Sequence, residues 1–345
     1  MQVRDVVIAG SGPSGLAAAI AASRRGLDYQ VLEKGVLTNS IYRFPRHMVF
    51  FTTPELLEIG GLPFVTPYEK PTRYEALRYY RRVADTYRVR IAFGEQVRAI
   101  RAGDVGTGAG RVLTIETRAE DGGEREYRAR AVVLAIGSYD HPNRLGVPGE
   151  DLPHVSHYYS EAHPCYRKRV VVVGGRNSAA EAALELYRAG ARVTLVHRGA
   201  ALSDTIKYWV LPDIQNRIKD GSIAGRFGTR VLEIRHEAVI IEREGVREEL
   251  PADVVFLLTG YHPDHELFRR VGIAIDSATC MPVHDPETLE TNVPNVFVIG
   301  GAISGRETAP IFIENGRLHG EKVVQVIAGR LGHAQRRTEN VKRRT

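Results

Sequence analysis

The chain has 345 residues, which is enough for about two domains of ordinary size. It is 43% hydrophobic and 26% charged with a net charge of +6, a globular composition that excludes a disordered or fibrous chain. No apolar stretch reaches the roughly 18 residues of a membrane-spanning helix. The first residues lack the basic and apolar regions of a signal peptide, so we do not expect secretion. Two cysteines cannot form a disulfide framework, so we expect a cytoplasmic protein that does not associate with membranes.

The first 33 residues predict a βαβ unit. Residues 6–10 form a continuous apolar run, which is typical of a parallel strand buried on both faces. A glycine motif follows at 10–15, then an alanine-rich helix over 16–25 and a second strand over 29–33. This order of strand, glycine turn, helix and strand is that of a dinucleotide-binding unit.

The glycine motif matches the full G-x-G-x-x-G pattern through Gly10, Gly12 and Gly15. The first glycine allows the tight turn, the second lets the backbone approach a pyrophosphate, and the third lets the helix pack against the strand. Ser11, Pro13 and Ser14 complete the loop. The helix N-terminus then offers N–H groups to the phosphates, and Glu33 is placed to accept hydrogen bonds from ribose hydroxyls.

The same plan recurs in the middle of the chain. Residues 170–173 are again a β-branched run, followed by a glycine loop at 174–179, a helix over 180–188 and a strand over 191–197. The spacing from Gly174 to His197 equals the spacing from Gly10 to Glu33. Two glycine loops with equal spacing to the next strand end predict a protein that binds two nucleotides.

The second loop departs from the first in ways that favour NADPH over NADH. Arg176 takes the place of the middle glycine, and its guanidinium can reach a phosphate. His197 and Arg198 stand where the first unit has Glu33, and Arg198 can pair with a 2′-phosphate that a carboxylate would repel. We expect the NADPH site to use Gly174, Gly175, Arg176, Asn177, Ser178, His197, Arg198 and Gly260.

Each unit is followed by an alternating pattern typical of an antiparallel meander and then by an apolar strand that ends in glycine. The meanders span roughly 97–130 and 231–250, and the strands span 132–137 and 254–260. A third such strand, 296–300, has no new glycine loop before it and is expected to complete the first sheet. The predicted fold is α/β, with two Rossmann-like three-layer domains and the NADPH domain inserted into a split FAD domain. The predicted parts are 1–155, 156–258 and 259–330, with a basic tail at 331–345 that we expect to be solvated rather than to bind nucleic acid.

The thiol content restricts the chemistry. A self-contained disulfide reductase normally carries a Cys-x-x-Cys pair beside the flavin, and this chain has none. Cys165 stands alone before the second unit, and one thiol cannot resolve a mixed disulfide within the chain. We treat Cys165 as a linker residue and Cys280 as a turn residue, and we expect no metal site.

Several longer runs carry a family resemblance over about residues 3–330. They are the runs NSIYRFP at 39–45, LGVPGEDL at 145–152, EAHP at 161–164, TGYHPDH at 259–265 and IFIENGR at 311–317. On these runs the chain resembles the thioredoxin-reductase-like flavoproteins, and within them the bacillithiol-disulfide reductase family. The resemblance implies FAD, NADPH, a cytoplasmic homodimer or homotetramer, and reduction of a low-molecular-weight thiol disulfide.

The resemblance also assigns roles to single residues. The family's proposed redox-active cysteine falls at Ser14, and serine cannot take part in thiol exchange. Gly301 stands where thioredoxin reductases have an aspartate near the flavin, and the bacillithiol branch also lacks that acid. The expected FAD contacts are the loop residues and Glu33, together with Lys34, Ser40, Tyr42, His47, Val97, Ala135, Gly137, Gly300, Gly301 and Ile311.

The electron acceptor stays open at this point. A small-molecule disulfide fits the family, whereas a ferredoxin or flavodoxin needs no cysteine pair and so is compatible with Ser14. A flavin monooxygenase also pairs two such loops, but residues 155–163 lack the F-x-G-x-x-x-H stretch of that class. A flavin-holding redox sensor without enzymatic activity is the remaining alternative.

Overall fold

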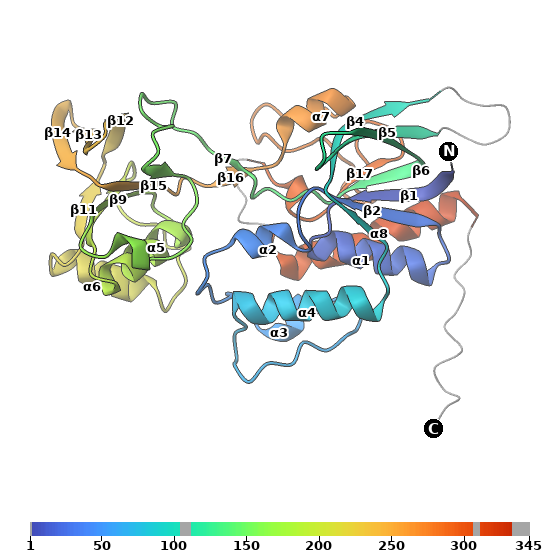
Figure 1. Cartoon of the computed structure of the whole chain (residues 1–345), viewed down its shortest axis with the longest axis horizontal. Helices are drawn as coiled ribbons and strands as arrows, with labels where there is room; N and C mark the ends of the chain where they lie inside the picture. The colour runs from blue at the N-terminus through green and yellow to red at the C-terminus, as the bar shows by residue number, and fades with distance from the viewer. Residues whose placement is uncertain (1, 104–111, 306–310, 333–345) are drawn as a thin grey trace. The chain divides into compact units, whose positions relative to one another are not determined.

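The computed structural model describes residues 2–103, 112–305 and 311–332, and its contacts divide the chain into two compact units. The first unit comprises residues 1–43, 52–141 and 261–345, and the second comprises 44–51 and 142–260 (Figure 1). The architecture is the predicted one, in which a second nucleotide-binding unit interrupts the first. The sequence-based boundaries at 155/156 and 258/259 stay predictions. All but the first two residues of the basic tail lie outside the described residues.

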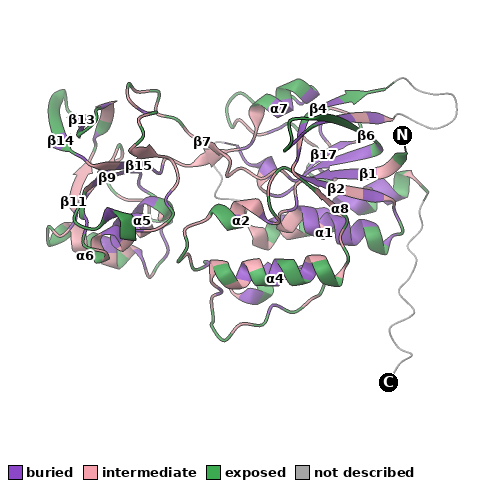
Figure 2. Ribbon diagram, in the orientation of Figure 1, coloured by how far each residue is buried: buried purple, intermediate pink, exposed green. Residues whose placement is uncertain are grey.

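The first unit is built on a parallel sheet with the order β3-β2-β1-β6, and β17 lies beside β6. The strands are β1 (Val3–Ala9), β2 (Tyr29–Glu33), β3 (Ile91–Phe93), β6 (Glu124–Leu134) and β17 (Val296–Val298). The apolar runs of β1, β2, β17 and the second half of β6 are buried on both faces, as in the purple strands of Figure 2, which is why they do not alternate in sequence.

The long strand β6 forms antiparallel pairs along its first half and parallel pairs along its second half. Its first half pairs antiparallel with β5 (Leu113–Ala119), which in turn pairs with β4 (Glu95–Ala102). Its second half pairs in parallel with β17 through Val132 and Val296. The strand predicted at 296–300 therefore completes the first sheet, as expected. Because β1, β6 and β17 run in one direction, their carboxyl ends meet at one edge.

Helix α1 (Pro13–Arg24) begins three residues earlier than the sequence predicts, inside the glycine motif, with proline in the first turn. It packs against α8 (Ile313–Arg330), where Gly316 and Gly320 allow close approach. Helix α4 (Arg73–Thr86) starts with a capping box formed by Thr72 and Glu75. The remaining helices of this unit are α2 (Asn39–Arg43), α3 (Pro54–Leu57), α7 (His265–Val271) and the short η2 (Gly300–Ile303).

The second unit has a five-stranded parallel sheet in the order β11-β10-β9-β15-β8. These strands are β8 (Val155–Ser156), β9 (Arg169–Val173), β10 (Arg192–His197), β11 (Ala224–Phe227) and β15 (Val254–Leu257). Helices α5 (Asn177–Arg188) and α6 (Leu211–Lys219) and the short η1 (His163–Cys165) complete it, and the meander forms β12 (Arg230–Ile234), β13 (Ala238–Arg243) and β14 (Val246–Pro251). A two-stranded pairing of β7 (His141–Pro142) with β16 (Tyr261–His262) lies where the chain leaves and re-enters the first unit.

Candidate functional site

The first glycine loop is the turn between β1 and α1, and backbone segments meet there too closely for a side chain. Gly10 has a φ of +106°, and a Cβ at this position would overlap the carbonyl oxygen of Ala135. A Cβ on Gly15 would in turn overlap the carbonyl oxygen of Gly10. Both positions therefore require glycine, and Ala135 closes the turn from the end of β6.

Gly12 lies on the open side of the same loop. Apart from its two chain neighbours and its own helix, no atom of residues 2–103, 112–305 or 311–332 lies within 4 Å of a Cβ placed on it, so a ligand can approach its backbone. Gly12 is also the N-cap residue of α1, and no side chain caps the helix there. The N–H groups and the positive dipole end of α1 are thus available to an anion such as a pyrophosphate. This open cradle is the feature that fits a dinucleotide.

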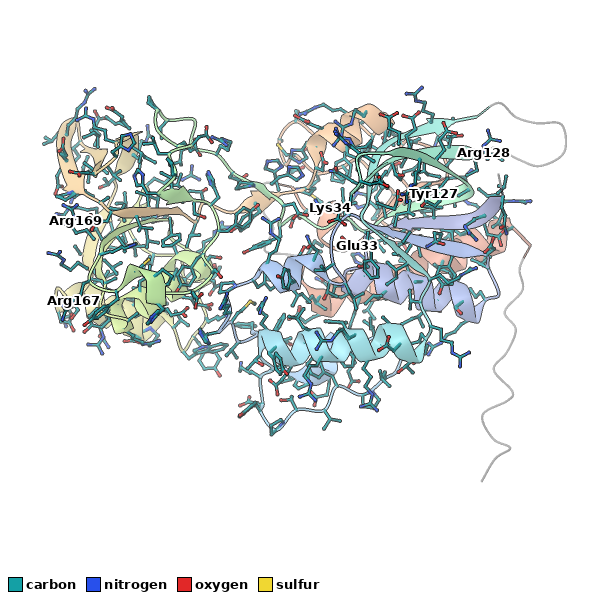
Figure 3. The ribbon with its side chains drawn as sticks, viewed as in Figure 1. Glu33, Lys34, Tyr127, Arg128, Arg167 and Arg169 are labelled. Atoms are coloured by element: carbon teal, nitrogen blue, oxygen red, sulfur yellow. The ribbon has the colours of Figure 1, made fainter. Side chains whose placement is uncertain are left out.

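Glu33, at the end of β2, holds the first glycine loop in place by hydrogen bonds (Figure 3 labels Glu33). One carboxylate oxygen accepts hydrogen bonds from the Ser11 N–H at 2.7 Å and from the Ser11 hydroxyl at 2.9 Å. The other accepts from the Gly35 N–H at 2.9 Å, and the side chain is buried. A carboxylate has about four acceptor positions, so Glu33 keeps capacity for a ribose hydroxyl while it fixes the loop.

Lys34 follows Glu33 and pairs with an acidic residue that is not among those predicted from sequence. Its ammonium lies 2.8 Å from the carboxylate of Asp140, which also pairs with Arg43 at 2.7 Å. Asp140 is mostly buried and comes three residues after Gly137, just past the end of the strand that forms this edge. Its position after an apolar strand ending in glycine is the sequence signal that could have identified it.

Ser14 lies in the first turn of α1, and its side chain is directed toward glycine backbone. A Cβ placed on Gly300 would overlap the Ser14 hydroxyl oxygen, and a Cβ on Gly316 would lie 3.2 Å from it. The Gly300 N–H donates a hydrogen bond to Nδ1 of His319 at 3.1 Å, which fixes this backbone from the side of α8. The side chain at position 14 therefore occupies the contact between η2 and α8.

The other expected flavin contacts are distributed over several elements. The Ser40 hydroxyl lies 3.7 Å from a Cβ position on Gly137, and a Cβ on Gly301 would lie 3.4 Å from the Gly137 Cα. Ser40, Gly137 and Gly301 thus converge at the carboxyl edge of the sheet. Tyr42 is exposed, and the Arg73 guanidinium lies 5.5 Å from its ring centroid. Val97 is buried at a bulge in β4, and Ile311 lies before α8. His47 belongs to the second unit.

The second glycine loop joins β9 to α5. Gly174 has a φ of +154°, and a Cβ there would lie 2.5 Å from the carbonyl oxygen of Leu258. A Cβ on Gly175 would overlap the imidazole of His197, and one on Gly199 would lie 2.6 Å from its Nε2. The ring of His197 therefore lies between two glycine backbones. Gly260, with a φ of +92°, accepts a hydrogen bond from the Asn143 N–H at 2.9 Å.

Positive charge gathers around this ring. Burial lowers the pKa of His197, and the nearby guanidinium groups of Arg198 and Arg176 lower it further. His197 is therefore neutral at pH 7, whereas Arg176 and Arg198 are exposed. Three residues chosen from sequence thus lie together, and two of them present charge to solvent beside the N-terminus of α5. This arrangement suits a phosphate group.

Asn177 and Ser178 are the first two residues of α5, and the chain around Lys207 covers this end of the helix. The side-chain amide oxygen Oδ1 of Asn177 accepts a hydrogen bond from the Lys207 N–H at 2.8 Å. The Ser203 N–H donates to the Gly175 carbonyl oxygen at 3.0 Å. Lys207 is not among the residues predicted from sequence, although a lysine among Ile206, Trp209 and Val210 is a signal for a buried charge.

The buried Cys165 thiol offers little reactivity. Burial raises the pKa of the Cys165 thiol, an effect only partly opposed by the Lys168 charge, so the thiol is protonated at neutral pH. Cys280 is partly buried in a turn of the first unit. Among residues 2–103, 112–305 and 311–332, no group of three metal-ligating side chains can hold a metal, and no helix can span a membrane.

The chain is similar to characterised proteins over almost its full length. Residues 7–300 match the model of the pyridine nucleotide-disulphide oxidoreductase family. The bacilliredoxin reductase of Bacillus subtilis is 44% identical over 329 residues, which cover 95% of this chain and 98% of that protein. The solved bacillithiol disulfide reductase of Bacillus cereus is 42% identical with a TM-score of 0.91, covering 95% of this chain and all of that one. The corresponding Staphylococcus aureus structure is 37% identical with a TM-score of 0.88, over 96% of this chain and 99% of that one.

Proposed function

Because the chain belongs to the pyridine nucleotide-disulphide oxidoreductase family, and within it to the bacillithiol disulfide reductase group, we propose that it reduces a low-molecular-weight thiol disulfide with electrons from NADPH. It is an FAD-dependent NAD(P)H oxidoreductase of that group. The observation that carries the finer proposal is the contrast between the two glycine loops. The first is closed by a carboxylate, Glu33, and the second is flanked by Arg176 and Arg198.

The first loop is proposed to hold FAD. Gly12 and the first turn of α1 would take the pyrophosphate, and Glu33 would accept from a ribose hydroxyl. When bound, the flavin supplies the two-electron chemistry, accepting a hydride and reducing the acceptor. The protein's part is to bind and orient both cofactors and to keep the flavin environment ordered, which the Lys34–Asp140 pair supports.

The second loop is proposed to select NADPH. Arg198 is exposed at the end of β10, where it can pair with a 2′-phosphate. Arg176 replaces the glycine that would approach the pyrophosphate, so its guanidinium is proposed to contact phosphate instead. Neutral His197 fixes the loop by lying against Gly175, and it adds no charge of its own at neutral pH.

The acceptor is proposed to be a disulfide that is reduced without a cysteine of this chain. Two electrons and two protons convert one disulfide to two thiols, and the reduced flavin supplies the electrons. Ser14 cannot form a mixed disulfide, and its side chain faces Gly300 and Gly316. Cys165 is a buried, protonated thiol. A ferredoxin or flavodoxin is the alternative acceptor, because it too needs no cysteine pair.

A panel of acceptors tests the proposal. The enzyme with bound FAD is reduced anaerobically with NADPH and then mixed with oxidised bacillithiol, a bacilliredoxin mixed disulfide, ferredoxin, flavodoxin or oxygen. We expect the thiol disulfides to restore the oxidised flavin spectrum faster than oxygen does. Faster reoxidation by ferredoxin or flavodoxin would replace the disulfide assignment, and a flavin that NADPH does not reduce would refute the oxidoreductase proposal. The family also implies a homodimer or homotetramer acting in the cytoplasm, and light scattering of the purified protein tests the oligomer.

A further inference from the structure

In the sequence, residues 44–51 stand between two stretches of the first unit, but their contacts place them in the second unit. The Arg46 N–H donates a hydrogen bond to the carbonyl oxygen of Ser160 at 2.9 Å, and its guanidinium lies 3.3 Å from the carboxylate of Glu161. Phe51 stacks on Trp209 with ring centroids 5.7 Å apart. The segment thus leaves α2 of the first unit and is then fixed to the nicotinamide unit.

Lys207 is the buried polar anchor of this segment. Its ammonium donates to the Val49 carbonyl oxygen at 3.0 Å and pairs with the Glu181 carboxylate at 2.5 Å. The ammonium also lies 5.7 Å from the centroid of the Trp209 ring. The Lys207 side chain is only 8% exposed, so the cation depends on these partners for the hydration it has lost.

The same residue touches the glycine loop of the nicotinamide unit through its backbone. Its N–H bonds to the side chain of Asn177, the first residue of α5, and Glu181 lies one helical turn further along α5. Lys207 therefore contacts the glycine-loop helix on one side and segment 44–51 on the other. The ammonium contacts the Val49 carbonyl, the Glu181 carboxylate and the Trp209 ring, all of them protein groups.

We propose that Lys207 is a positioning residue for hydride transfer, because it ties segment 44–51 to the nicotinamide glycine loop. That segment continues directly from α2, whose Ser40 lies beside Gly137 at the edge where the flavin is proposed to bind. The inference rests on the proposed NADPH-to-flavin reaction. Hydride transfer is sensitive to small displacements of its donor and acceptor, so loss of the tie slows the step without weakening NADPH binding.

The test measures the anaerobic reduction of bound flavin by NADPH in a stopped-flow spectrophotometer over a range of NADPH concentrations. We expect Lys207→Met to lower the limiting rate by about tenfold or more and to change the apparent Kd for NADPH by less than about threefold. Lys207→Arg, which keeps the charge, should restore part of the rate. Arg188→Met is the matched control, since it removes an exposed ion pair with Asp213 in the same unit. Its limiting rate should equal that of the parent.

Each outcome decides a separate question. If NADPH does not reduce the flavin of the parent protein, the proposed function is refuted. If the parent and Lys207→Met have the same limiting rate of flavin reduction, only the positioning role is refuted. A rise in apparent Kd with an unchanged limiting rate also overturns the role, and so does an equal loss in Arg188→Met. Should Lys207→Met not fold, Glu181→Gln removes the carboxylate that neutralises the buried ammonium and so weakens the anchor that holds Val49. An unchanged limiting rate in that variant would contradict the inference.

Discussion

The imidazole of His197 lies directly against the backbone of Gly175, so that a side chain at position 175 would overlap the ring. His197 ends β10, and the corresponding residue at the end of β2 is Glu33. Glu33 accepts hydrogen bonds from Ser11 of its loop instead of stacking on the loop backbone. The two glycine loops are thus fixed by different means, a carboxylate in one and an aromatic ring in the other. Arg198 is exposed beside the second loop.

Gly175→Ala is expected to weaken NADPH binding by about tenfold, because the new methyl group must displace the His197 ring. FAD content should stay that of the parent, since Gly175 belongs to the second unit. The apparent Kd from anaerobic flavin reduction and the FAD-to-protein absorbance ratio measure the two effects. An unchanged Kd would show that His197 does not support the loop in its binding form.

Arg198→Ala is expected to raise the KM for NADPH by about 10- to 100-fold, the loss expected for a charge-assisted hydrogen bond to phosphate. The KM for NADH should change much less, because NADH lacks the 2′-phosphate. Steady-state kinetics with both cofactors measure this ratio. Equal effects on the two would remove Arg198 from the 2′-phosphate site.

Ser14→Cys is expected to leave the rate of disulfide reduction within about twofold of the parent, because the side chain at position 14 faces Gly300 and Gly316. The rate of flavin reoxidation by oxidised bacillithiol measures the effect, and mass spectrometry of the mixture detects any mixed disulfide. A several-fold faster reaction with a trapped adduct would instead show that a cysteine at this position can act.

Gly320→Ala is expected to lower the free energy of unfolding by about 1–3 kcal/mol, because the methyl group would overlap the backbone nitrogen of Ala18 on α1. Gly329→Ala on the same helix is the control. In the part of the chain that the structure describes, a Cβ there meets no atom within 4 Å outside its own helix, and the better helix former should add up to about 1 kcal/mol of stability. Chemical denaturation of both variants checks this, and similar changes in both would contradict close packing of α1 on α8.

Asp253→Asn is expected to destabilise the protein at pH 7 and to have little effect near pH 2. Arg169 and its N–H, at 2.7 Å, hold the pKa of Asp253 at about 2 in the folded state (Figure 3 marks Arg169). Because the folded pKa lies below the unfolded value of about 4, the stabilisation is present above pH 4 and is lost as the pH falls toward 2. Urea denaturation at both pH values measures the difference. An equal loss at both would show that ionisation of Asp253 does not contribute.

The sequence by itself determined the two glycine loops, their parallel strands and the inserted arrangement of units. Those features depend on local requirements: glycine where the backbone crowds, continuous apolar runs where a strand is buried on both faces, and a capping position at a helix start. The family resemblance and the fold class followed from the same runs and were confirmed by the matching relatives. The assignments of single cofactor contacts stay predictions.

The tertiary structure alone decided what the side chains between these motifs contact. It brought Asp140 to Lys34 and Arg43, directed Ser14 toward Gly300 and Gly316, and fixed residues 44–51 to the second unit through Lys207. These contacts join residues that are tens to hundreds of positions apart, and no local pattern encodes them. The ion pairs and the Lys207 contacts form because a buried charge needs a partner wherever the fold supplies one.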